Sequence, residues 1–237
     1  MMTTTNHVRK LAALGVSLGT ILCASQARAA EFGERGQFIV SADRLFPLLS
    51  FSDVQQNEFG TNVKDTYQQS SLSLFVGSTP PQDTFYTVPR LGLDYVITSH
   101  LTVGGDVVLY TTLGTSGSTG NNSSGSGPTT FLFGLAPRVG YVLAFSDMFA
   151  FWPRGGLSWY TTSSNGPGDT GGGLNQLALD LDPQFVITPV SHFGFTAGVT
   201  ADIPLTGGHS VTENNTTTSA GASILFVGAT VGMLGYF

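Results

Sequence analysis

The sequence predicts an all-β fold, a transmembrane up-and-down antiparallel β-barrel of eight strands. Two observations predict it. Strand-like runs are joined by connections that alternate between very short and long. Within the runs, apolar side chains alternate with glycine and polar ones, and Lys and Glu are almost absent. A soluble β-sandwich also alternates, but it usually carries Lys and Glu on its outer face, so it is the weaker alternative.

The connections define the strands in chain order. Three short turns are expected at 99–100, 146–148 and 190–192, and four long polar loops at about 50–84, 114–128, 163–172 and 207–217. The eight strands between them are approximately residues 36–49, 85–98, 101–113, 129–145, 149–162, 173–189, 193–206 and 218–237. Residues 71–77 carry a short apolar run that could be a further strand or a cap over the barrel mouth.

Alternation assigns each side chain to lipid or lumen. In strand 85–98, Leu91, Leu93 and Tyr95 share one face, while Arg90 and Asp94 share the other. The later strands repeat this pattern, and aromatic residues gather near the strand ends, as interface girdles do. Phe85 falls on the expected lipid face, as does Arg44, unless Arg44 lies at the rim or beyond a bulge.

The expected lumen is filled with polar side chains and glycine, because eight strands enclose little more than the room that side chains need. Three arginines and six aspartates fall on the inward face, and we expect them to form a salt-bridged network. The inward set is Asp43, Arg90, Asp94, Asp106, Arg138, Arg154, Asp180, Asp182 and Asp202. Each arginine follows a proline and precedes a glycine by two residues. Proline has no N–H to donate to the strand ladder, which indicates bulges at these three prolines and at Pro183.

The N-terminus has the features of an export signal. Arg9 and Lys10 precede a short apolar run that ends near a small-x-small site, so residues 1–29 are expected to be a signal peptide and residues 30–237 the barrel domain. Cys23, the only cysteine, could instead carry a lipoprotein anchor, although Leu22 before it fits such a site poorly. Without residues 1–29, six basic residues face 15 acidic ones, a net charge of −9 that argues against nucleic-acid binding.

The exported chain, with three tight turns, four long loops and a C-terminal Phe237, resembles the small outer-membrane barrels of the OmpA, OmpX and OmpW type. The resemblance implies an outer-membrane location, lipid around the barrel, loops outside the cell and both termini in the periplasm. It also implies that Tyr236 and Phe237 form a signal read by the barrel-assembly machinery.

Function is less constrained than fold. The leading expectation is a non-enzymatic barrel that supports the envelope or offers its loops to an unknown partner. The alternative is a narrow, porin-like channel that prefers cations. An outer-leaflet lipid- or peptide-modifying enzyme is the third class, with His209 and Ser210 as the available pair and Asp169 or Glu213 to orient them. No motif indicates a cofactor or a metal.

Overall fold

The computed structural model describes residues 31–58, 64–72, 86, 88–117, 124–166, 170–213 and 216–237. The predicted signal peptide, 1–29, lies outside this part of the chain. Within the described residues, no helix has the length and apolar character needed to cross a membrane.

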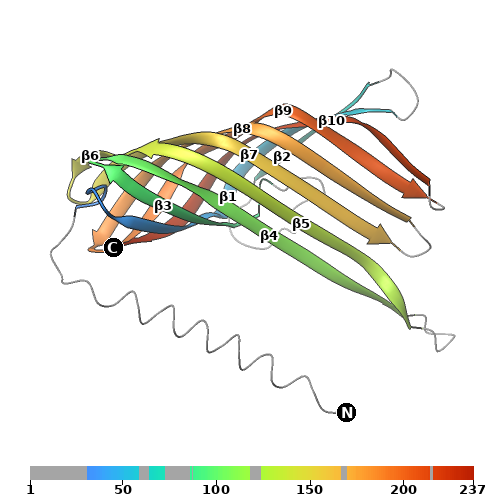
Figure 1. Ribbon diagram of the computed structural model, residues 1–237, viewed down its shortest axis with the longest axis horizontal. Coiled ribbons are helices and arrows are strands. Elements are labelled where there is room, and N and C mark those ends of the chain that lie inside the picture. The colour runs from blue at the N-terminus through green and yellow to red at the C-terminus, as the bar shows by residue number, and fades with distance from the viewer. Residues whose placement is uncertain are drawn as a thin grey trace, which may run out of the picture.

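The described residues form one antiparallel sheet that closes on itself (Figure 1). Its order is β10-β9-β8-β7-β5-β4-β3-β1, and β1 pairs with β10 to complete a ring of eight, as predicted. The strands are β1 (Phe38–Asn57), β2 (Lys64–Leu72), β3 (Arg90–Thr98), β4 (Leu101–Gly117), β5 (Ser124–Tyr141), β6 (Leu143–Ser146), β7 (Phe149–Gly166), β8 (Thr170–Val190), β9 (Phe193–Glu213) and β10 (Thr216–Tyr236).

The two ends of the barrel differ. At the turn end lie the tight connections around His100, Met148 and His192, together with Phe237 and the first described residues. At the loop end the strands run on as long hairpins (Figure 1). All three short connections lie where they were predicted.

The predicted long loops are wrong over much of their length, because the strands continue into them. β4 reaches Gly117 and β5 begins at Ser124, while β9 and β10 run to Glu213 and from Thr216. These segments are rich in Ser, Thr and Gly, and their polarity suggested loops. Hairpin hydrogen bonding needs no apolar face, so polar residues can extend a ladder beyond the bilayer.

The wall beside β1 is divided between two strands. β3 pairs with β1 over Phe38 to Asp43, and β2 pairs with it from Leu49 onward. The predicted strand 85–98 therefore starts late, at Arg90. Phe85 and residues 73–77 lie outside the described residues, whereas Ser71 and Leu72 belong to β2.

The predicted strand 129–145 is broken at Val142, which separates β5 from β6. The bulges expected at prolines are absent at three of them. Leu135 pairs with Trp159 and Arg138 with Gly156 in one unshifted register on either side of Pro137. Pro153 and Pro183 lie opposite each other in an unshifted β7–β8 pair. The wall accommodates these prolines without inserting a residue.

Candidate functional site in the barrel lumen

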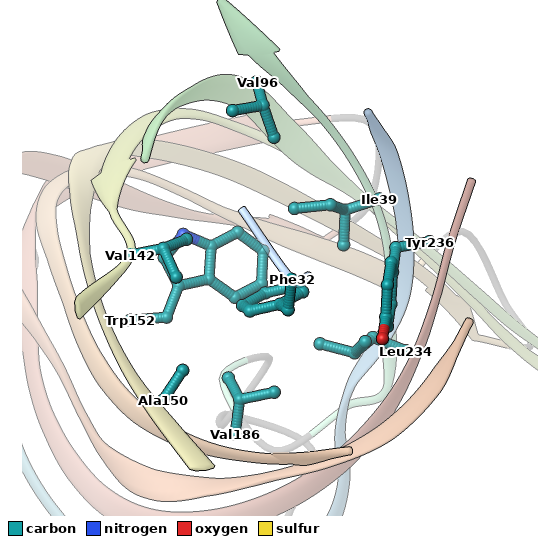
Figure 2. Close-up of a cluster of buried hydrophobic side chains, with 9 residues drawn as sticks. All are labelled: Phe32, Ile39, Val96, Val142, Ala150, Trp152, Val186, Leu234 and Tyr236. Atoms are coloured by element: carbon teal, nitrogen blue, oxygen red, sulfur yellow. The ribbon is translucent and has the colours of Figure 1, made fainter. Parts of the chain in front are cut away.

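The lumen is filled in three layers. An apolar layer closes the turn end, a second apolar layer lies toward the loop end, and charged side chains lie between them. The turn-end layer is Phe32, Ile39, Val96, Val142, Ala150, Trp152, Val186, Leu234 and Tyr236 (Figure 2). The loop-end layer is Val54, Tyr86, Val88, Val108, Leu132, Tyr160, Ile224 and Phe226. The prediction of a polar interior was therefore incomplete, since two of the three layers are apolar.

The turn-end layer centres on a residue that is not in any strand. Figure 2 shows Phe32 among side chains that converge on it from the surrounding wall. Its ring lies 5.5 Å from that of Trp152 and 5.4 Å from that of Tyr236, in edge-on contacts. The Gly33 carbonyl accepts a 2.9 Å hydrogen bond from the His100 N–H in the first tight turn.

The loop-end layer also centres on a residue outside the strands. Tyr86 is fully buried, with its ring 5.1 Å from that of Tyr160 and 5.2 Å from that of Phe226. Gln176 donates to its hydroxyl, and Gln176 is itself fixed by two hydrogen bonds of 2.7 and 2.8 Å to the backbone of Ile224.

The charged layer has two parts. The part next to Trp152, here named the inner cluster, consists of Arg138, Arg154, Asp43, Asp94, Asp106 and Asp182. Arg138 lies 2.9 Å from Asp43, 2.5 Å from Asp94 and 2.6 Å from Asp106. Arg154 binds Asp43 at 3.0 Å and also pairs with Asp182.

The other part, the outer cluster, consists of Arg44, Arg90, Asp180 and Asp202. Arg44 lies 3.2 Å from Asp180 and 2.8 Å from Asp202, and Arg90 lies 3.3 Å from Asp180. The structure thus brings all nine sequence-predicted lumen residues into salt bridges, and adds Arg44 as a fourth arginine.

Arg44 does not face lipid, and the alternative of a bulge at this position is confirmed. The register to β10 shifts between Ala42 and Phe46, and Arg44 has a φ of 55°, which few non-glycine residues adopt. The bulge reverses the alternation, so that Asp43 and Arg44 both point inward. Arg44 then donates to the Tyr86 carbonyl at 3.1 Å and to Thr200.

The two Pro-Arg-x-Gly motifs of β5 and β7 interlock. Arg138 lies opposite Gly156 and Gly140 opposite Arg154 in the antiparallel ladder. A Cβ on Gly140 would lie only 3.0 Å from Arg154 Cγ and 2.7 Å from the Trp152 ring nitrogen. Gly140 therefore leaves room for the side chain of Arg154, and Gly156 leaves room for the backbone of Pro137 and Arg138.

Aromatic rings support the arginines from both sides. Trp152 lies beneath Arg154 at 4.4 Å and Arg138 at 5.7 Å, which joins the inner cluster to the turn-end layer. Tyr160 lies 5.1 Å from Arg90 and Phe226 5.8 Å from Arg44, which joins the outer cluster to the loop-end layer.

The exterior is the reverse of a soluble protein's surface. Its exposed large side chains are apolar around the whole ring, as the alternation predicted; examples from seven of the eight wall positions are Leu91, Leu93, Leu109, Val139, Phe145, Phe149, Leu181, Phe185, Phe195, Val199 and Val227. Charge lies inside and hydrocarbon outside. A closed ring leaves no unpaired edge in lipid. The chain is a transmembrane β-barrel of the outer-membrane type.

Several solved outer-membrane barrels resemble the fold. OprG from Pseudomonas aeruginosa is 12% identical, with 85% of this chain and 96% of that chain covered and a TM-score of 0.47. AlkL is 14% identical, with 90% and 95% covered and a TM-score of 0.46. Ail of Yersinia pestis is 8% identical, with 86% and 99% covered and a TM-score of 0.37. No family model and no curated protein matches the sequence.

The remaining candidate residues lie away from the lumen network. Tyr236 is buried in the turn-end layer, and Phe237 exchanges two backbone hydrogen bonds, of 2.9 and 3.0 Å, with Phe38. His209 and Ser210 are consecutive residues of β9, so their side chains point to opposite faces of the wall. Asp169 lies outside the described residues, and Glu213 is exposed. The described His, Cys, Asp and Glu residues include no group arranged to hold a metal ion.

Proposed function

We propose that this barrel is closed to ions and serves the outer membrane as an envelope component or as a platform for its loop-end hairpins. The layered filling of the lumen carries the proposal. Ion-paired side chains lie between two apolar layers, and the arginines and aspartates of the network are at least 95% buried. Among the described residues, this filling supports a lumen that hydrated ions do not cross.

The strand lengths support the platform role. A strand of 20 residues rises roughly 65 Å, or about 50 Å along a barrel axis at ~40° tilt, whereas the apolar band of such barrels is about 25 Å tall. β8, β9 and β10 have 21 residues each. Their Ser-, Thr- and Gly-rich loop-end halves therefore project well beyond the lipid, where partners can reach them.

Single-channel recording in planar bilayers tests the closed lumen. Folded protein is expected to give no reproducible current, and the paired variant Asp94→Asn/Asp106→Asn is expected to stay silent too. A steady current from the unmodified protein would overturn the proposal.

A narrow cation-preferring channel is the second candidate, and the charge count of the inner cluster favours it. Four aspartates there face only two arginines. Carboxylates in excess concentrate cations wherever water penetrates. If this candidate holds, the unmodified protein carries a cation-selective current, and Asp94→Asn/Asp106→Asn reduces it.

A non-enzymatic role is part of the proposal. It is supported by the opposed directions of His209 and Ser210, which separate the two groups that an activated nucleophile would need within hydrogen-bond reach. Assays of lipid and peptide turnover by His209→Ala and Ser210→Ala test it, and any turnover that both substitutions abolish would contradict it.

We also propose that Tyr236 and Phe237 are read by the barrel-assembly machinery during insertion. Both residues are tied into the ladder of the finished barrel, so the signal would be accessible only before closure. Phe237→Ala should slow assembly of the barrel in outer membranes while leaving the stability of refolded protein nearly unchanged.

A further inference from the structure

Each end of the charged layer is covered by a residue that lies outside the wall ladder. Phe32 covers the turn end and is 96% buried, and Tyr86 covers the loop end and is fully buried. The other members of the two apolar layers are mostly strand residues, which cannot move without breaking interstrand hydrogen bonds. Phe32 and Tyr86 lie outside the strands.

The segment that carries Phe32 is closed by its own hydrogen bonds and bound to the wall through Gly33, Gly36 and Gln37. The Gln37 side chain donates a 2.7 Å hydrogen bond to the Glu31 carbonyl and accepts a 2.9 Å hydrogen bond from the Gly33 N–H. These two bonds close residues 31–37 into a compact turn. Before Gln37, two backbone hydrogen bonds tie the segment to the wall. The His100 N–H donates to the Gly33 carbonyl and the Gly36 N–H donates to the Val96 carbonyl, both at 2.9 Å. The segment can therefore leave the mouth while the β1–β10 closure stays intact.

Tyr86 is held by side chains of the wall. Arg44 and Gln176 donate to its carbonyl and hydroxyl, and two aromatic rings flank it. It contacts the outer cluster through Arg44, whereas Phe32 reaches the inner cluster through Trp152. The two covering residues thus shield different arginines.

We propose that residues 31–37 and Tyr86 are two independent stoppers of the lumen. The segment 31–37 separates the inner cluster from water at the turn end, and Tyr86 separates the outer cluster from water at the loop end. Release of one stopper hydrates its own cluster and leaves the other cluster dry. The proposal rests on the closed lumen of the proposed function and adds a built-in way to open it from each side.

Two buried serines provide matched reporters. Ser41 donates to Asp43 in the inner cluster at 2.8 Å, and Ser158 donates to Asp202 in the outer cluster at 3.0 Å. Ser41→Cys or Ser158→Cys, each with Cys23→Ser, leaves one thiol in the chain. The rate at which a small charged thiol reagent modifies folded protein in vesicles then measures water access to each cluster.

The stopper variants should give a crossed result. Phe32→Gly is expected to speed modification at position 41 by about tenfold or more and to leave position 158 protected; Tyr86→Gly should do the reverse. The lipid-facing Phe193→Gly, a matched loss of an aromatic ring, should change neither rate. Protection of both thiols in both variants, or exposure of both thiols by either variant, would overturn the proposal.

A second pair of variants displaces the segment without removing a side chain. Gly33 and Gly36 both have φ near +95°, but a Cβ on Gly33 would lie 2.9 Å from Val142, whereas one on Gly36 meets nothing within 4 Å. Gly33→Ala should expose position 41 more than Gly36→Ala does. Equal rates in two folded variants would overturn the turn-end stopper. A current from unmodified protein would overturn the proposed function and this inference with it, whereas unchanged protection of the thiols in the stopper variants of a silent barrel would overturn this inference alone.

Discussion

The inner and outer clusters are built from the same two residue types, yet they differ in charge balance. The outer cluster has two arginines and two aspartates, while the inner cluster has two arginines and four aspartates. Both lie in a layer shielded from water, where each unpaired charge costs several kcal/mol. Burial at this depth therefore does not require equal numbers of opposite charges.

The inner cluster compensates by sharing donors. Arg138 contacts three carboxylates, and neutral donors supplement the arginines, since Ser41 donates to Asp43 and Gln184 donates to Asp182 at 2.5 Å. The outer cluster shares its donors less, because the hydrogen bonds of Asp202 come from Arg44 and Ser158. Removing a positive charge should therefore lower the free energy of unfolding most in the inner cluster. Removing a negative charge should lower it most in the outer cluster.

Arg138→Met should have the largest effect. It removes the arginine partner of Asp94 and Asp106 and one of the two arginines that bind Asp43. One arginine is then left facing four carboxylates, so we expect a loss of at least about 3 to 5 kcal/mol, or failure to fold. Urea unfolding of the barrel in lipid vesicles measures this. Arg35→Met, at an exposed position before β1, should stay within about 0.5 kcal/mol of the unmodified protein. Near-normal stability of Arg138→Met would refute the shared-donor account.

Asp202→Asn should come next. Asp202 is fully buried and accepts from Arg44 at 2.8 Å and from Ser158 at 3.0 Å. The substitution leaves Arg44 and Arg90 facing one aspartate, with an expected loss of about 2 to 4 kcal/mol in the same assay. A change below about 0.5 kcal/mol would mean that charge balance does not distinguish the two clusters.

Alternation explains why the sequence predicted some parts of this site and missed others. The inward positions of Asp94 and Arg138 follow from a two-residue period that continues along a strand. Arg44 was misplaced because a bulge reverses that period, and no local signal such as glycine marks it. Phe32 was missed because it precedes the first strand, where alternation carries no information, and Tyr86 was assigned to the predicted strand 85–98, which begins only at Arg90. The hairpin extensions were missed because they are rich in Ser, Thr and Gly, which suggested loops.

Gly140→Ala should have a moderate effect, because it blocks the interlocked motifs next to the inner cluster. The added Cβ would meet Thr102, Trp152 and Arg154 at 2.6 to 3.0 Å, all through side chains that can shift slightly. Overpacking of this kind costs typically about 1 to 3 kcal/mol. Gly155→Ala is the matched control, since its Cβ would find only ordinary contacts of 3.5 and 3.6 Å. Equal unfolding midpoints for the two variants would argue against the interlock.

Asp106→Asn should have the smallest effect. Asp106 Oδ1 lies 2.6 Å from Arg138 Nη1 in a salt bridge, but outside the geometry of a hydrogen bond. Arg138 keeps Asp43 and Asp94 when the carboxylate becomes an amide, and the excess of negative charge falls from two to one. We expect a change between about −1 and +1 kcal/mol, against the larger loss for Asp202→Asn. The two substitutions are the same chemical change, so their difference in unfolding free energy compares the clusters in charge balance and hydrogen bonding together, and equal losses would argue against the imbalance as a source of tolerance.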